Sequence, residues 1–257
     1  MILQIISANY VHDMACLYLQ DVKIVLSNID ANNNNNGSSN CRLIHADFME
    51  KEKHILDNNS IDLILTEPPY GFEALAIYEG LAWLADRVLK PGGSLVFFVD
   101  HVILDHVIRL FDDNNDNLKY WWIFCVKHSR NHSKVYPRNV CVEWNPMLWY
   151  VKGDKTNNLT LSNTIGDHID AKPLPKTPDD REQSSVEAEY IIKNLTIENQ
   201  TVLDPMMGLG TVGIAAFNMK RKFIGIEKDS EKFKIANARM NNGYKSSTQN
   251  YQNSFVS

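Results

Sequence analysis

The chain has 257 residues, 44% of them hydrophobic, which is enough for one sizeable α/β domain with a true core. Its formal net charge of −5 excludes a generally basic coat for nucleic acid, so any such contact must be a local patch. The four cysteines form no CxxC pair, which predicts a reducing cytoplasm without a metal site or disulfide. The sequence has no apolar stretch of roughly 20 residues and no basic N-terminal leader, so we expect neither a membrane span nor a signal peptide.

The first half of the chain predicts strands and helices in alternation. Residues 1–30 predict mixed helix and strand, and the asparagine-rich run 32–40 predicts a polar loop. The elements that follow are a strand at 41–47, a buried strand at 61–65, a helix at 74–89 stopped by Lys90-Pro-Gly-Gly, and a strand at 94–100.

The second half begins with two aromatic, β-rich runs, 120–126 and 140–151, joined by the basic segment 127–138. This pattern predicts an antiparallel pair at one edge of the sheet, with a basic loop between its strands. Residues 153–182 are polar and predict a long loop or linker. The remaining predicted elements are a helix at 185–194, a strand at 201–204, a helix at 211–219, a strand at 222–227, a helix at 231–240 and a frayed tail from 244.

Strands that alternate with helices predict an α/β fold with a doubly wound, mostly parallel sheet. In such sheets, ligands bind outside the carboxyl ends of the strands. Four acids fall at predicted carboxyl ends, namely Asp47, Glu67, Asp204 and Glu227. We therefore expect these side chains to converge on one crevice, although they lie far apart in the sequence.

The segment 204–211 (DPMMGLGT) follows a predicted strand and opens a helix. Gly208 and Gly210 allow the backbone to approach a ligand, and the helix N-terminus offers N–H groups to a carboxylate or phosphate. Glu227 ends the next strand, where a carboxylate can accept hydrogen bonds from both hydroxyls of a ribose. The unit therefore suits an adenosine-bearing cofactor. An ordinary tight turn stays open as an alternative, and NAD is disfavoured because Asp-Pro ahead of the glycines is atypical.

The run 61–71 (IDLILTEPPYG) ends in an acid, two prolines and an aromatic residue. An exocyclic base amine is a poor nucleophile because its lone pair is conjugated with the ring. Hydrogen bonds from the amine to Glu67 and to the Pro68 carbonyl would localise that lone pair and direct it at a sulfonium methyl. Tyr70 would stack on the base, which must be extruded from a duplex or already be single-stranded. The alternative is that the two prolines merely end a strand.

Taken together, these motifs resemble the amino-methyltransferase family that modifies adenine N6 or cytosine N4 in DNA. The chain is similar in particular to the permuted (β-like) class, in which the catalytic motif precedes the cofactor motif. The matching segments span residues 40 to 240 and are 45–47 (HAD), 66–71 (TEPPYG), 183–190 (QSSVEAEY), 204–211 and 221–229 (RKFIGIEKD). The resemblance implies a Rossmann-like methyltransferase fold in a single domain, 1–257, with S-adenosyl-L-methionine as cofactor and DNA methylation of the restriction–modification type as activity.

The resemblance also implies which residues form the site. The catalytic residues are Glu67, Pro68, Pro69 and Tyr70. The cofactor-binding residues are Asp47, Gln183, Ser184, Asp204, Pro205, Gly208, Gly210, Thr211 and Glu227. Three features depart from the family pattern. Glu67 is longer than the usual residue by one methylene, about 1.5 Å; Met206 and Leu209 replace a phenylalanine and a small polar residue; and no large insertion provides a target-recognition domain.

The basic segment is the candidate contact for nucleic-acid phosphates, through Lys127, Arg130, Lys134 and Arg138. An ordinary solvated loop stays open as its alternative. Because no large insertion provides a target-recognition domain, low sequence specificity, a specificity partner and a homodimer all stay open.

The sequence therefore favours an S-adenosylmethionine-dependent N-methyltransferase that acts on nucleic acid, with DNA preferred over RNA. Two alternatives stay open. One is a methyltransferase of RNA or of a protein amide, because the acid-Pro-Pro-Tyr motif suits other planar amines. The other is a catalytically degenerate subunit that only binds nucleic acid, which Glu67 favours and the intact cofactor turn opposes.

Overall fold

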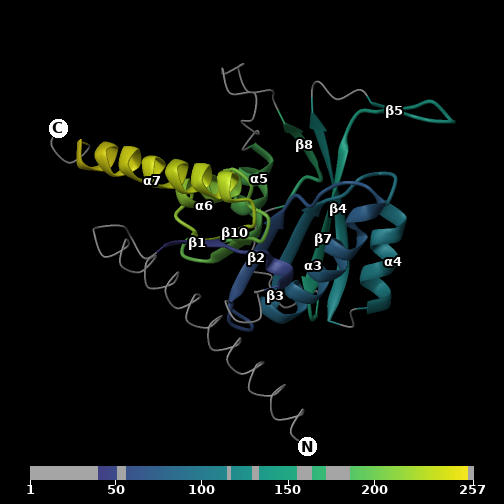
Figure 1. The fold of residues 1–257 in the computed structure, drawn as a ribbon, viewed down its shortest axis with the longest axis horizontal. Helices are drawn as coiled ribbons and strands as arrows, with labels where there is room; N and C mark the ends of the chain where they lie inside the picture. The colour runs from purple at the N-terminus through teal and green to yellow at the C-terminus, as the bar shows by residue number, and fades with distance from the viewer. Residues whose placement is uncertain are drawn as a thin grey trace, which may run out of the picture. The chain divides into compact units, whose positions relative to one another are not determined.

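The structure, a computed structural model, describes residues 40–50, 56–114, 117–128, 133–154, 164–171 and 186–253 (Figure 1). Residues 1–39 form a unit of their own outside the described residues, and the described elements all belong to the unit 40–257. The predictions for 1–30 and for most of the asparagine-rich run therefore fall outside the described residues. The single domain at 1–257 stays a prediction.

The described sheet has eight strands in the order β1-β10-β9-β2-β3-β7-β4-β8. Its first five strands are mutually parallel, as the sequence predicted. They are β1 (Cys41–His45), β10 (Lys222–Glu227), β9 (Thr201–Asp204), β2 (Ile61–Thr66) and β3 (Leu89–Phe98). The central strands are buried almost throughout, because helices cover both faces of the sheet.

Strand β3 corrects the prediction that Lys90-Pro-Gly-Gly separates a helix from a later strand. The strand already starts at Leu89, and a register irregularity in β2 between Ile61 and Leu63 accommodates the prolyl-glycyl segment. The Lys90 ammonium lies 2.8 Å from the Asp62 carboxylate and fixes this start.

The predicted antiparallel pair exists as β4 (Leu118–His128) and β7 (Asn145–Lys152), and β7 also runs antiparallel to β3. The pair does not form the edge of the sheet, however. Residues 153–182, predicted to be a loop, contain the strand β8 (His168–Ala171), which pairs with β4 in parallel and forms the edge instead. Ile169 and Ala171 are buried on alternate positions, so burial of one face explains this strand in a polar segment.

The run 140–151 is likewise two strands instead of one. Its first part, β6 (Val140–Val142), pairs with β5 (Ser133–Val135) in a separate two-stranded sheet, which we call the β5–β6 hairpin. Strands β3 and β4 both run antiparallel to β7, so the carboxyl ends of β3 and β4 lie at the same edge of the sheet. The hairpin, which lies in the chain between β4 and β7, therefore leaves the sheet at the edge where the parallel strands end.

The helices cover the sheet in two layers. On one face lie η1 (Phe72–Ala74), α3 (Leu75–Val88) and α4 (Leu104–Asn114); on the other lie α5 (Val186–Leu195), α6 (Thr211–Asn218) and α7 (Ser230–Asn253). Alternate strand residues serve the two layers: Ile64 packs with α3, whereas Leu63 and Leu65 pack with α5 and α6. Helix α4 was not predicted, and α7 continues to Asn253 through most of the tail predicted to be frayed. None of the described helices is long and apolar enough to cross a membrane.

The order in which the chain adds strands to the sheet reverses between β2 and β9. The chain leaves β2 through α3 toward β3 on one side, and leaves β9 through α6 toward β10 on the other. The two strands are nevertheless hydrogen-bonded neighbours, with Ile64 paired to Leu203. Such a switch point opens a crevice at the carboxyl ends of the strands.

Candidate active site

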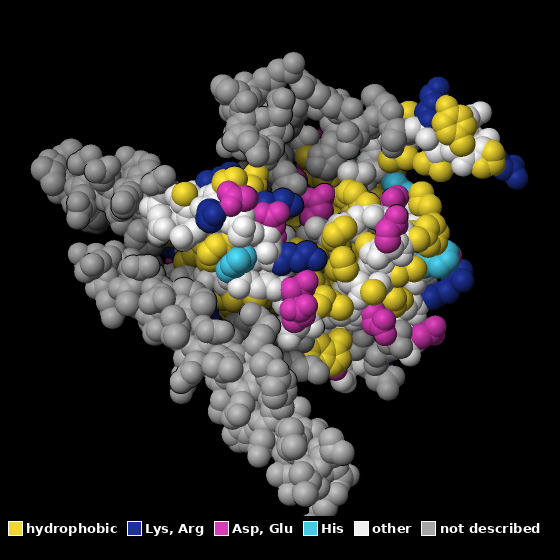
Figure 2. All heavy atoms as spheres, in the orientation of Figure 1, with side chains coloured by type: hydrophobic (Ala, Val, Ile, Leu, Met, Phe, Trp, Pro, Cys, Tyr) yellow, Lys and Arg dark blue, Asp and Glu magenta, His cyan; other side chains and the backbone are white. Residues whose placement is uncertain are grey.

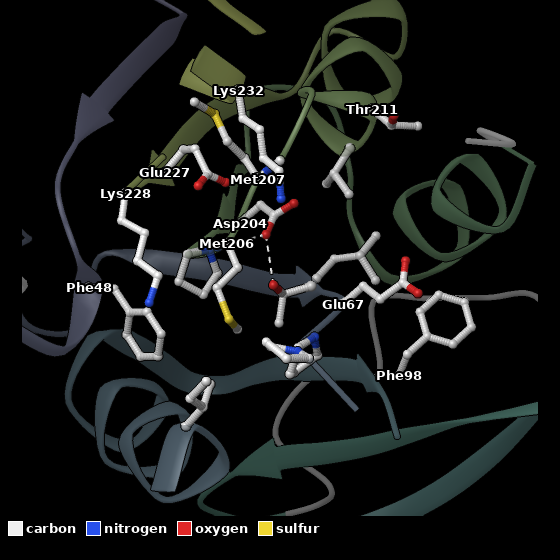
Figure 3. Close-up of a pocket in the computed structure, with 18 of the residues that line it drawn as sticks. Phe48, Glu67, Phe98, Asp204, Met206, Met207, Thr211, Glu227, Lys228 and Lys232 are labelled. Atoms are coloured by element: carbon white, nitrogen blue, oxygen red, sulfur yellow. Dashed lines mark hydrogen bonds between the residues drawn. The ribbon is translucent and has the colours of Figure 1, made fainter. Parts of the chain in front are cut away.

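A cavity of about 480 Å³ lies at this switch point, within the 300–1,000 Å³ usual for small-molecule sites (Figure 3). All four predicted catalytic residues line it: Glu67, Pro68, Pro69 and Tyr70. Six predicted cofactor residues line it as well: Asp47, Asp204, Pro205, Gly208, Thr211 and Glu227. The convergence of the four strand-end acids is therefore confirmed as a matter of geometry. Gln183 and Ser184 lie outside the described residues.

The glycine turn at 208–210 has the backbone that only glycine adopts readily. Gly208 has a φ of 54° and Gly210 a φ of 83°, in the left-handed region. Gly210 is the N-cap of α6, and a Cβ there would lie 3.4 Å from Ala236 of α7. Arg239 of α7 donates a hydrogen bond to the carbonyl of Leu209 at 3.0 Å. The turn is thus held between two helices, and the Gly210 N–H donates to the Met207 carbonyl at 2.8 Å. Gly208 lines the cavity, whereas the predicted cofactor residue Gly210 does not.

Glu227 is held by the same turn. One carboxylate oxygen accepts the N–H of Gly208 at 2.9 Å, and the other accepts the N–H of Asp229 at 2.8 Å. The side chain is only 8% exposed and lines the cavity. Each oxygen keeps a second lone pair, so the carboxylate is oriented to accept hydrogen bonds from a diol.

Asp204 lines the cavity and is almost completely buried. Its Oδ1 accepts the Thr66 hydroxyl at 2.7 Å, drawn as a dashed line in Figure 3, and the N–H of Met206 at 3.1 Å. Burial raises the pKa of Asp204 to about 7; these two hydrogen bonds oppose the rise, and the charges of Glu227 and Glu67 add to it. Asp204 is therefore partly protonated at neutral pH.

Two lysines bring positive charge to this acidic cavity. The Lys228 ammonium lies 3.4 Å from the Asp47 carboxylate, which also accepts the N–H of Met49. Lys232, in the first turns of α7, extends into the cavity toward Asp204 (Figure 3). Neither lysine was predicted as a site residue, although both follow Glu227 closely in the chain.

The predicted catalytic motif at 67–70 is held by two tyrosines. The Tyr70 hydroxyl donates to Glu67 at 2.5 Å. Burial and the neighbouring Glu67 carboxylate raise the pKa of Tyr70, so its hydroxyl stays protonated as the donor. The fully buried Tyr78 of α3 donates to the carbonyl of Phe98 at 3.3 Å and lies 3.5 Å from that of Pro69. The motif is thus fixed to the end of β3, while 46% of the Tyr70 side chain remains exposed.

Beyond Glu67, the cavity continues along apolar strand ends. Phe98 ends β3 and Met147 lies near the start of β7, and both line the cavity with Ile77 of α3. Figure 3 shows the Glu67 carboxylate beside the Phe98 ring. Glu187, in the first turn of α5, also lines the cavity and is 9% exposed. Phe98, Met147 and Ile77 were not predicted, because apolar residues at strand ends and on a helix carry no motif. Glu187 lies inside the matching segment 183–190, although it was not named as a site residue.

The predicted basic residues do not line the cavity. Lys127 lies near the end of β4, and Lys134 and Arg138 lie on the β5–β6 hairpin, all three exposed. Arg130 lies outside the described residues. Among the residues that the structure describes, no group of three or more His, Cys, Asp or Glu side chains is arranged to hold a metal ion.

Comparison with known proteins identifies the family. The DNA methylase model N6_N4_Mtase matches residues 61–238. The type II methyltransferase M2.LlaDCHI of Lactococcus lactis subsp. cremoris is 46% identical over 258 residues, covering 79% of this chain and 90% of that relative. M.HpaI of Haemophilus parainfluenzae, also a type II methyltransferase, is 23% identical and covers 79% and 75%. The crystal structure of an M1.HpyAVI–SAM complex has a TM-score of 0.59 at 27% identity, covering 78% of this chain and 99% of that one. The chain therefore belongs to the N6-adenine/N4-cytosine DNA methyltransferase family, which uses S-adenosyl-L-methionine to methylate exocyclic amines in DNA.

Proposed function

We propose that Glu67 and the Pro68 carbonyl accept hydrogen bonds from the exocyclic amine of an adenine or cytosine in DNA, beside S-adenosylmethionine held by Glu227, Asp47 and the glycine turn. One observation carries the proposal: both motifs line one cavity at the switch point, although 138 residues separate Thr66 and Asp204 in the chain. Glu67 and Glu227 thus belong to one site.

The residues present suit the cofactor. The carboxylate of Glu227 is oriented for the two ribose hydroxyls, and the N-terminus of α6 at Thr211 suits the carboxylate of the methionine part. When bound, S-adenosylmethionine supplies an electrophilic methyl group on a positive sulfur. Glu67 and the ionised form of Asp204 place negative charge in the same cavity, which favours a cationic ligand.

At the catalytic end, Glu67 has two tasks. Its carboxylate accepts the amine N–H and localises the nitrogen lone pair toward the methyl carbon. With the cofactor bound, Glu67 would hold the amine for attack on the methyl group that S-adenosylmethionine supplies, and would accept the proton that the amine loses. The extra methylene of Glu67 is consistent with its bond to Tyr70, since the longer side chain reaches that hydroxyl. Tyr70 then stacks on the base while its hydroxyl orients Glu67.

We further propose that the β5–β6 hairpin contacts the DNA beside the extruded base. Figure 2 shows Lys and Arg side chains gathered with hydrophobic ones where Figure 1 draws this hairpin. Its turn residue Tyr136 is 72% exposed and lies between Lys134 and Arg138. Because the hairpin leaves the sheet at the cavity edge, its cations suit phosphates and its aromatic ring suits an unstacked base.

Duplex and single-stranded oligonucleotides test the hairpin. Tyr136→Ala should reduce kcat/KM on a duplex by about tenfold and on a single strand much less, since one base stack contributes about 1–3 kcal/mol. Val140→Ala is the matched control, an exposed apolar residue (56%) on the same hairpin. Equal losses on both substrates would contradict the assignment.

Three further aspects belong to the proposal. The motif order favours the permuted class, and the site acts in the cytoplasm. Without a large target-recognition insertion, sequence specificity comes from the hairpin, from a second copy or from a partner subunit.

Mass spectrometry of nucleosides after incubation with labelled cofactor and DNA tests the activity and identifies the base. A subunit that binds cofactor without methyl transfer would favour the degenerate alternative.

A further inference from the structure

One hydrogen bond joins the two halves of the cavity directly. Thr66 is the last residue of β2, immediately before Glu67, and Asp204 is the last residue of β9, at the start of the cofactor turn. Their side chains lie 2.7 Å apart, oxygen to oxygen, and are 2% and 3% exposed. The backbone pairing of the two strands ends at Ile64 and Leu203, and a second side-chain link, from the Thr201 N–H to the Asp62 carboxylate at 2.8 Å, lies at the opposite end of the strands.

The same bond bears on the charge of Asp204. The carboxylate faces Glu67 beyond β2, Glu227 of β10, Glu187 of α5 and Lys232 of α7, which all line its cavity. Burial raises its pKa to about 7, and the donors that lower it are the Thr66 hydroxyl and the Met206 N–H. Removal of the Thr66 donor therefore keeps the carboxyl neutral to a higher pH.

We propose that Thr66 is a positioning residue that couples the catalytic motif to the cofactor turn through Asp204. The inference rests on the proposed function, because it assumes that the cation of the cofactor binds in this cavity. The Thr66 hydroxyl holds Oδ1 between β2 and the Met206 amide, so the cofactor turn keeps one distance from Glu67. It also lowers the pKa of Asp204, so that more of this carboxyl is ionised when a cationic ligand enters.

Three variants test this role through affinity for S-adenosylmethionine as a function of pH. Thr66→Val preserves shape without the donor, Thr66→Ser preserves the donor, and Thr66→Ala replaces the valine variant if that protein does not fold. The affinity of the valine variant at pH 7 should fall by about tenfold, as for the loss of one hydrogen bond to a charged group. The midpoint of its pH dependence should move upward, so that the loss shrinks in alkali, whereas serine should restore both. The titration of the ligand itself is common to all variants and cancels.

A cycle with Asp204→Asn identifies the route. In that background residue 204 no longer titrates, so Thr66→Val should leave the pH midpoint where Asp204→Asn alone puts it. A midpoint unchanged by Thr66→Val, or a shift that persists in the asparagine background, would overturn the proposal. Both measurements record cofactor binding and not methyl transfer. If the wild-type protein binds S-adenosylmethionine but does not methylate DNA, the proposed catalysis is contradicted, whereas the role of Thr66 can still be tested.

Discussion

Replacement of Glu227 by alanine should weaken cofactor binding without unfolding the protein. The carboxylate accepts backbone N–H groups at 2.9 and 2.8 Å and is proposed to accept the ribose hydroxyls as well. A hydrogen bond to a charged group contributes about 1.5–3 kcal/mol. Water can enter the space at the cavity wall and satisfy the two N–H groups, so the ribose term remains. We therefore expect affinity for S-adenosylmethionine to fall by about 10- to 100-fold.

Isothermal calorimetry with S-adenosylmethionine and S-adenosylhomocysteine measures this loss. The two ligands share the ribose, so both should weaken equally. Glu231→Ala is the matched control: its carboxylate pairs with Lys234 on the exposed face of α7, where an ion pair contributes about 0–1 kcal/mol. The affinity of Glu227→Gln should lie between those of the wild type and Glu227→Ala. The glutamine amide keeps one acceptor oxygen but places an NH₂ group against a backbone N–H. Unchanged affinity in a folded Glu227→Ala protein would refute the ribose assignment.

Three other predictions follow from the site. Glu67→Asp should methylate DNA more slowly than the wild type, because the shorter side chain no longer accepts the hydrogen bond from the Tyr70 hydroxyl. Faster single-turnover methylation by this variant would instead indicate that glutamate at this position has reduced the activity of the enzyme. Alanine at Lys127, Arg130, Lys134 and Arg138 should flatten the salt dependence of DNA affinity by about 0.7–0.9 log units per log salt for each phosphate contact, and an identical slope would show that DNA binds elsewhere. The pKa of Asp204 is about 7 in the folded protein and about 3.8 in the unfolded chain. Between these pH values the folded state binds more protons than the unfolded state. The free energy of unfolding therefore falls as pH rises through this range, by at most about 1.36 kcal/mol per pH unit. Asp204→Asn should flatten that fall in denaturant titrations of the cofactor-free protein, and an unaltered slope would assign it to other groups.

The parallel half of the fold follows from local sequence. Continuous apolar runs bounded by polar residues predicted β9 and β10 with their observed bounds and β2 to within one residue. Helix α4 carried a signal that was overlooked: Ile103, Val107 and Phe111 are spaced by four residues, and all are buried. Strand β8 carried little signal, since its four residues become a strand through pairing with β4.

The site divides in the same way. Strand-end acids could be predicted because a parallel sheet brings its carboxyl ends together. Phe98 and Met147 could not, because an apolar residue that lines a cavity reads like one in the core. The Thr66–Asp204 bond depends on which strands are neighbours, and a sequence without its strand order does not contain that fact.

The most direct test of the central claim is single-turnover methyl transfer from labelled S-adenosylmethionine to DNA, read by nucleoside mass spectrometry in wild type and Glu67→Ala. We expect N6-methyladenine or N4-methylcytosine in wild-type reactions, and a rate on the order of 10²-fold lower in the variant with nearly unchanged cofactor affinity. Cofactor binding without methylated DNA, or full activity in Glu67→Ala, would contradict it.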